Sequence, residues 1–247
     1  MAIYVYTNSP GEEWQPLIPG DYTLLRWPCD EGFHVPLIEE RQAIMTSWLN
    51  TSQFKSYLHI PLAGFRDKDG SWNNGNSYAY LRTSSPDGSL SKRFRFDNAY
   101  SYSNSTDRRS FGFSIRWFRD TPIIPDSNRT ETVTGKMWYI STLWLISILV
   151  WMNQYVTMQD KNVWATVVWN DWDAITNDNR WKYFQWWNNY GFTYWSTWDT
   201  SSTLVDASSY WPNNPYSSST FITTSDIPYD RSNPRNDNLR WYTDFNS

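Results

Sequence analysis

The chain has 247 residues, 40% of them hydrophobic, and a formal net charge of −4 at pH 7. This length and composition suffice for a hydrophobic core in one large domain or two small ones, and they exclude a chain that is disordered throughout. Because nucleic-acid binders normally carry a basic patch or stripe, the acidic balance also argues against a nucleic-acid partner.

The first part of the chain is predicted to hold one helix and two strands. Residues 1–26 are punctuated by proline and glycine and predict an irregular lead-in. A helix is predicted over Leu37 to Leu49 and a strand over Tyr57 to Phe65. A loop of Asp, Gly and Asn residues follows over Arg66 to Ser77, and Phe111 to Phe118 alternates as a half-buried strand does.

The predicted helix has the strongest helical pattern in the chain. We expect Glu39, Glu40 and Arg41 on its solvated face. Its apolar positions recur at helical spacing and are Leu37, Ile38, Ile44, Met45, Trp48 and Leu49.

A linker divides the chain into two predicted modules. Thr121 to Gly135 contains two prolines and alternating polar residues, which is typical of a connection. We therefore expect one module over residues 1–120, a linker over 121–136 and a second module over 137–247, with the two modules forming one domain.

The second module opens on an uncharged and mostly apolar run, Met137 to Met152. A membrane-spanning helix needs about 20 such residues, and this run is shorter and rich in β-branched and aromatic residues. We favour two buried strands joined by a turn, with one transmembrane helix as the alternative. A strand over Tyr155 to Val163, a short helix around Asn179 to Trp186 and a tail of ordered loops and short strands follow.

Tryptophan and glycine are distributed unevenly between the two modules. Residues 136–247 contain thirteen tryptophans and one glycine, whereas residues 1–135 contain five tryptophans and nine glycines. Turns need glycine where φ is positive, and an average soluble chain contains about 7% of it. We therefore interpret several tryptophans as standing where a glycine belongs; were Trp144 and Trp151 among them, the strand interpretation of the apolar run would gain support.

No catalytic constellation emerges from the sequence. The chain has two histidines, His34 and His59, and one cysteine, Cys29, so a Ser/His/Asp or Cys/His site would use nearly the whole supply. We interpret His34 as a structural histidine. A disulfide within the chain and a cysteine-based zinc site are excluded, and no glycine-rich phosphate loop occurs. We expect no cofactor, no metal and no enzymatic activity.

Clusters of charged residues are interpreted as solvated. This applies to the acid pairs Asp67/Asp69 and Asp171/Asp173, which could in principle hold a cation. The tripeptide Trp169-Asn170-Asp171 is similar to the calcium motif of sugar-binding C-type lectins, but a tripeptide alone is a weak signal. We also expect a solvated face for the local basic cluster of Arg108, Arg109, Arg116 and Arg119.

An ordered series of short motifs resembles the Fibrobacter succinogenes major paralogous domain, a bacterial surface module related to the C-type lectin-like fold. The motifs of that family's C-terminal half are similar to Cys29–Pro36, the helix with Glu39-Glu40, Pro61–Arg66, Thr83–Pro86 and Gly112–Arg116. Those of its N-terminal half are similar to Met158–Thr166 and Tyr183–Asn188. Together these blocks cover about two thirds of the chain.

The chain departs from the family in three ways. Its halves come in reversed order, as in a circular permutant or in the end of one repeat followed by the start of the next. Trp164 and Trp187 occupy family glycines, which a reassigned codon, read as glycine by the source organism, would explain. Trp117 stands where the family tends to have a cysteine and Arg82 where it tends to have a tryptophan, so Cys29 lacks the disulfide partner that the resemblance implies.

The resemblance implies an α+β, C-type lectin-like mixed fold with a small antiparallel sheet, one or two helices and long ordered loops. It also implies a non-catalytic binding module of adhesin type, extracellular or on the cell surface, although the N-terminus shows no signal peptide. Its ligand would be an unknown protein or carbohydrate.

The segment 71–110 is dense in Tyr, Arg, Ser, Asn and Asp, a composition that suits adaptable contact surfaces. Alternating spacing is expected to place several of its larger side chains on one exposed strand face. The predicted binding residues are Tyr78, Tyr80, Arg82, Arg93, Arg95, Tyr100 and Tyr102.

Three alternatives remain open. The segment could be the diversified region of a retroelement-mutated lectin-like protein, or the chain a structural repeat of a large envelope or phage-tail-like protein. An enzyme related to the formylglycine-generating fold is disfavoured, because that chemistry relies on cysteines and a metal.

Overall fold

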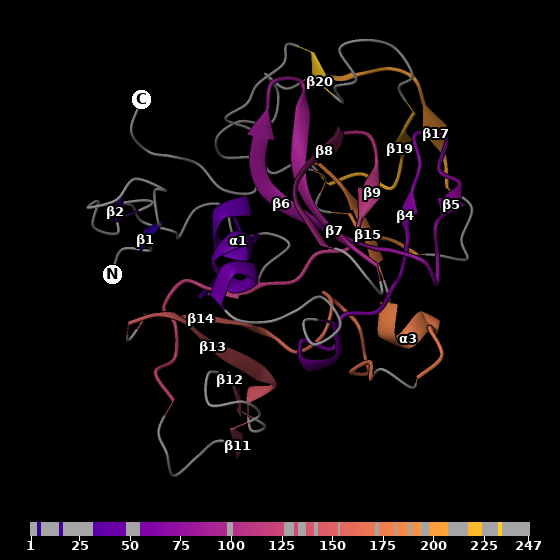
Figure 1. The fold of residues 1–247 in the computed structure, drawn as a ribbon. Helices are drawn as coiled ribbons and strands as arrows, with labels where there is room; N and C mark the ends of the chain where they lie inside the picture. The colour runs from indigo at the N-terminus through magenta and orange to yellow at the C-terminus, as the bar shows by residue number, and fades with distance from the viewer. Residues whose placement is uncertain are drawn as a thin grey trace.

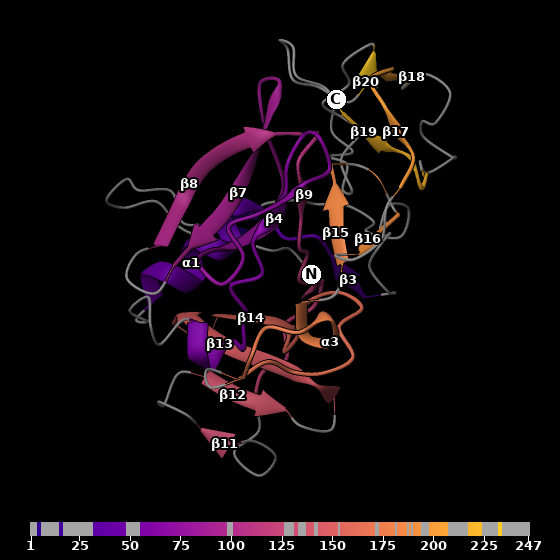
Figure 2. The same ribbon diagram turned by 90° about the vertical axis from the view of Figure 1, so that its right-hand side faces the viewer.

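The computed structural model describes residues 4–5, 15–16, 32–47, 55–97, 101–125, 131–132, 137–140, 143–152, 154–170, 173–180, 182–186, 188, 190–193, 198–206, 217–223 and 232–233. Over these residues the fold is α+β and predominantly β, with three main sheets and short helices. In Figure 2 the six-stranded sheet lies below the other two, and the three-stranded and five-stranded sheets lie side by side above it.

The six-stranded sheet is antiparallel throughout and joins both predicted modules. Its strands, in spatial order, are β11 (Glu131–Thr132), β12 (Met137–Ile140), β13 (Leu145–Trp151), β14 (Gln154–Gln159), β10 (Phe118–Arg119) and β3 (Phe33–His34).

The other two main sheets are also antiparallel. The three-stranded sheet consists of β6 (Ala79–Asp87), β7 (Leu90–Phe96) and β8 (Ser101–Arg108). The five-stranded sheet has the order β16 (Phe192–Thr193), β15 (Lys182–Gln185), β9 (Gly112–Phe113), β4 (Phe65–Arg66) and β5 (Trp72–Asn73).

Three two-stranded pairs complete the described strands. β1 (Tyr4–Val5) pairs antiparallel with β2 (Gln15–Pro16), and the other two pairs are parallel. The parallel pairs are β17 (Thr200–Ser201) with β19 (Phe221–Ile222), and β18 (Val205–Asp206) with β20 (Ser232–Asn233).

The main hydrophobic core lies where the helix α1 (Ile38–Ser47) contacts β13 and the three-stranded sheet. In Figure 1 α1 lies between the three-stranded sheet above and β13 and β14 below. The core includes Ile44 of α1, Phe94 of β7 and Ile146 of β13, all fully buried. Burial of such side chains supplies most of the free energy that holds these elements together.

Strands from the two predicted modules pair directly with one another. Phe118 of β10 lies opposite Met158 of β14, and Phe113 of β9 lies opposite Phe184 of β15. The expected pairing of the Gly112–Phe118 segment with the Tyr155–Val163 segment is confirmed at its C-terminal end alone, with α1 packed on the same sheet. Gly112 and Phe113 lie instead in the five-stranded sheet, beside β15 and β4. That the modules form one permuted domain remains a prediction.

The apolar run Met137 to Met152 forms the β-hairpin β12–β13, as expected. None of the helices in the described part of the chain combines the length and the apolar character that crossing a membrane requires. Ser147, a polar residue of this run, is buried with partners: its hydroxyl donates to the Ile123 carbonyl at 2.6 Å and lies 3.0 Å from the Thr157 hydroxyl. These bonds fix the start of the predicted linker against the sheet.

Several predicted elements differ from the observed ones. Of the predicted strand Tyr57 to Phe65, only Phe65 lies in a strand; Pro61 lacks a backbone N–H and His59 has a positive φ of 52°, so this segment cannot extend a ladder. The predicted strand Phe111 to Phe118 is interrupted between β9 and β10.

The predicted helix Asn179 to Trp186 is mostly wrong as well. α3 (Asn177–Arg180) ends before β15 begins, and β15 pairs with β9 and β16. Within α1, Glu40 and Arg41 are buried rather than solvated. Trp48 and Leu49 lie outside the described residues.

Candidate binding surface

The structure places the predicted binding residues on the three-stranded sheet. Tyr78 immediately precedes β6, which contains Tyr80 and Arg82, and β7 contains Arg93 and Arg95. Tyr100 lies outside the described residues, and for Tyr102 the structure describes the backbone alone, in β8.

The register of β6 and β7 brings five of these residues onto one face. Tyr80 lies opposite Arg95, and Arg82 lies opposite Arg93. The guanidinium carbon of Arg93 lies 5.0 Å from the ring centre of Tyr80, and that of Arg95 lies 5.1 Å from the ring centre of Tyr78. Alternation along the strands therefore placed these side chains together, as the sequence predicted.

This face is mostly interior, which corrects the prediction of an exposed binding face. Tyr80, Arg82 and Arg93 are between 0% and 7% exposed, because the five-stranded sheet packs over them. Tyr80 stacks on Phe113 with ring centres 5.6 Å apart and lies 4.8 Å from Phe65. These three residues support the sheet packing and are not available to a ligand.

The two buried arginines of this face are held by polar partners. Arg82 donates to the Ser91 hydroxyl at 2.6 Å and to the Phe111 carbonyl, and its guanidinium carbon lies 4.3 Å from the ring centre of Phe113. Arg93 forms an ion pair with Asp107 of β8. A guanidinium that is bonded and stacked in this way costs far less to bury than an unpaired one.

Four half-buried side chains border this interior layer, and we call them the Tyr78 edge: Tyr78, Arg95, Arg108 and Phe111. The ring of Tyr78 lies 6.0 Å from that of Tyr80, and the ring of Phe111 lies 5.2 Å from that of Phe65. The guanidinium of Arg108 lies 5.8 Å from the ring of Phe111. Arg108 and Phe111 are not among the predicted binding residues, because they lie at the far end of β8 and in the turn after it.

His34 occupies a structural site, as expected. Its Nδ1 lies 2.8 Å from Asp120, and its Nε2 lies 3.0 Å from both oxygens of Glu40. Burial lowers the pKa of His34, but the charge of Glu40 and the hydrogen bonds to Asp120 and Glu40 outweigh it and raise the pKa to about 9. The imidazolium thus joins β3 to the N-terminus of α1, where Glu40 also accepts from the Leu37 amide.

Two arginines of the predicted basic cluster are buried, which corrects the expected solvated face. Arg109 donates to the carbonyls of Gly88 and Leu90, and Arg116 donates to those of Leu58 and His59. Each arginine therefore satisfies two backbone carbonyls, those of the β6–β7 connection for Arg109 and those of residues 58 and 59 for Arg116. Sequence reasoning missed this role, since a buried and a solvated arginine look alike in one sequence.

The described members of the two predicted acid pairs serve turns. Asp67 and Asp69 accept the backbone amides of Lys68 and Ser71, and Asp173 accepts both amide groups of Asn170. Asp171 lies outside the described residues. Among the residues that the structure does describe, no three His, Cys, Asp or Glu side chains are grouped as a metal site.

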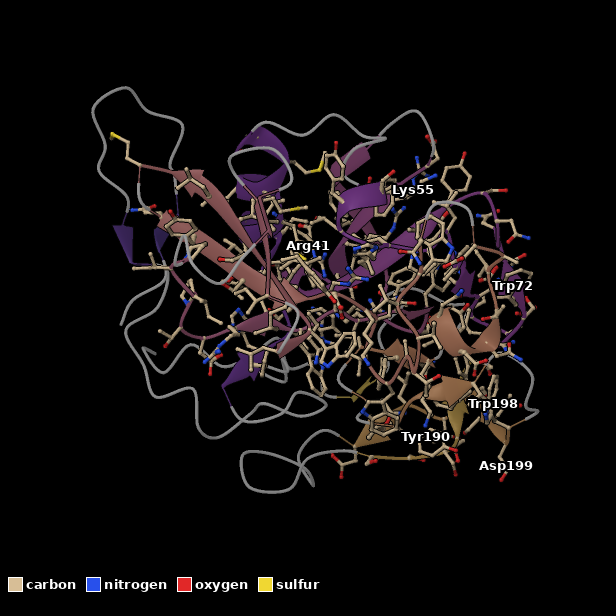
Figure 3. The ribbon with its side chains drawn as sticks, turned by 90° about the horizontal axis from the view of Figure 1, so that it is seen from below. Arg41, Lys55, Trp72, Tyr190, Trp198 and Asp199 are labelled. Carbon is tan, nitrogen blue, oxygen red and sulfur yellow. The ribbon has the colours of Figure 1, made fainter. Side chains whose placement is uncertain are left out.

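A second aromatic cluster covers the other face of the five-stranded sheet. The guanidinium carbon of Arg66 lies 4.4 Å from the ring centre of Trp198, and Phe192 contacts the rings of Tyr190, Trp198 and Phe221. In Figure 3 Tyr190, Trp198 and Asp199 lie together at the periphery, whereas Arg41 lies in the interior. Arg66 is buried and donates to the carbonyls of Gly70 and Thr193, which indicates a packing role for its part of the cluster.

Comparison with known proteins adds no assignment to this surface. The chain matches no protein-family model, no curated protein and no solved structure.

Proposed function

We propose that the chain is a non-catalytic binding module of C-type lectin-like fold, secreted by or displayed on a bacterial cell, and that its ligand contacts the Tyr78 edge. The observation that carries this proposal is the combination of two arginines and two aromatic side chains at the half-buried border of a rigid layer. Tyr and Arg are enriched among the residues that dominate binding energy, and Trp, Tyr and Arg anchors act best when their own packing fixes them.

The packing beneath the Tyr78 edge supports this role. Tyr80, Phe65 and Phe113 form a buried cluster against which Tyr78 and Phe111 pack. Stacking of a ligand on Tyr78 would therefore cost little side-chain conformational entropy of the protein, since the ring already packs against the buried cluster. His34 supports the non-catalytic assignment, because it is buried and bonded on both ring nitrogens.

The permuted arrangement of the two family-like halves belongs to the same proposal. Its support is the pairing of β9 with β15 and of β10 with β14, which joins segments from the two predicted modules. Permutation is tolerated where the natural termini of a domain lie close together.

The proposal is tested by screening the purified chain on a glycan array and against a displayed peptide library, and then measuring the affinity of the best binder. We expect Tyr78→Ala and Arg95→Ala each to weaken that binding at least about tenfold, the loss typical of a dominant contact. Asp199→Ala, an exposed residue in a different part of the structure, should change it less than about twofold. Unchanged affinity in both test variants would show that the ligand binds elsewhere, and no binder in either screen would contradict the binding function itself.

A further inference from the structure

Two tryptophans have a backbone conformation that suits glycine. Trp144 has a φ of 55° and Trp164 a φ of 64°. The other described non-glycine residues with positive φ are one histidine and two asparagines, the types that visit this region most readily. A bulky aromatic residue there is a genuine outlier, and the chain has two of the same type.

The turn around Trp164 explains why its position needs glycine. The Ala165 amide donates to the Asn162 carbonyl at 2.9 Å, which closes a four-residue turn over residues 162–165. Trp164 is the third residue of this turn and has positive φ, whereas Val163 does not. That combination defines a type II turn, whose third position is normally glycine.

Trp144 closes the loop of the hairpin formed by β12 and β13. Ile140 pairs with Leu145, so residue 144 is the last of the connection before β13 begins. Hairpin loops of this kind commonly close on a residue in the left-handed conformation, usually glycine.

Neither indole contributes to a core. Trp144 is 57% exposed and Trp164 39% exposed. The Lys161 Nζ lies 5.9 Å from the ring centre of Trp144, and the Lys182 Nζ lies 4.0 Å from that of Trp164. Trp164 also meets Phe184 edge-on at 6.2 Å. Exposed cation–π contacts of this kind are weak, so they do not account for two strained backbones.

Four other described tryptophans are buried or donate a hydrogen bond to a backbone carbonyl. Trp117, Trp169 and Trp186 are at most 4% exposed, and none has positive φ. The Trp169 indole donates to the Asp173 carbonyl at 3.1 Å, and that of Trp72 donates to the Ala63 carbonyl at 2.9 Å. Among the tryptophans that the structure describes, backbone conformation and burial therefore distinguish two classes, which composition alone could not do.

We propose that residues 144 and 164 are glycine in the protein that the source organism makes, and that one codon translated here as tryptophan is read there as glycine. Trp72, Trp117, Trp169 and Trp186 are then true tryptophans and carry a different codon. Glycine at these two positions accounts for part of the glycine shortage in residues 136–247, where one glycine accompanies thirteen tryptophans. This inference is independent of the proposed function.

The direct test reads the gene and measures peptide masses of the protein isolated from its source. We expect one codon at positions 144 and 164, another at 72, 117, 169 and 186, and peptide masses that show glycine only at the first two positions. Tryptophan masses at 144 and 164 in the native protein would overturn the proposal.

A second test uses the recombinant chain with paired substitutions. At 144 and 164 the glycine variant should melt above the alanine variant by about 2–4 °C, because alanine removes the indole but keeps the strained Cβ. At Trp169 both variants should melt below the parent, with glycine no higher than alanine. Glycine melting at or below alanine at both 144 and 164 would refute the conformational argument.

Discussion

Deprotonation of His34 should destabilise the fold, because its imidazolium is held between two buried carboxylates. The pKa rises from 6.5 to about 9 despite burial, which by itself lowers it, because Glu40 and Asp120 favour the charged ring. Tenfold tighter proton binding is worth about 1.4 kcal/mol, so this interaction contributes about 3 kcal/mol. Since the folded pKa lies above the unfolded one, the contribution is complete below about pH 6.5 and is lost as the pH rises through about 9.

The assay is equilibrium urea unfolding, followed by tryptophan fluorescence, at several pH values from 6.5 to 9. His59 does not interfere in this window: burial and the charge of Arg116 lower its pKa, so its effect on stability is a loss below about pH 6.5. Asp120→Asn keeps an acceptor for Nδ1 but removes one charge, so its fall in stability should again begin near pH 6.5 but be smaller and end at a lower pH. A free energy of unfolding that stays constant or rises from pH 6.5 to pH 9 would refute the reasoning.

Three further substitutions test the packing by denaturant unfolding. Gly75→Ala should cost about 1–3 kcal/mol, because the new Cβ would lie 1.6 Å from a ring carbon of Trp72; an unchanged midpoint would mean that the indole does not lie there. Arg116→Met should lower the free energy of unfolding by about 3 kcal/mol, since it leaves buried carbonyls without a donor. The same substitution at half-buried Arg119 should lower it by less than about 1 kcal/mol. Equal losses in the two variants would contradict the argument from burial. Gln185→Leu should lower the free energy of unfolding by about 2 kcal/mol. The Gln185 amide accepts from the Ile222 N–H and donates to the carbonyls of Ile222 and Ser110. An unchanged free energy would show that these backbone groups find other partners.

The sequence by itself determined the local features of this protein. Apolar β-branched and aromatic residues over Met137 to Met152 predicted the hairpin β12–β13, and helical spacing predicted α1. Alternation placed Tyr80 and Arg82 on one face of a strand. These features depend on the spacing of apolar and polar residues within one segment, which can be read directly from the sequence.

Only the tertiary structure decided which faces are covered. The same alternation that aligned Tyr80, Arg82 and Arg93 could not reveal that the five-stranded sheet packs on them, because the covering Phe113 lies outside their hairpin. Arg116 is buried for a similar reason, since its acceptors lie almost sixty residues away. Burial depends on long-range packing, and a polar side chain carries no local mark of the partner that will satisfy it.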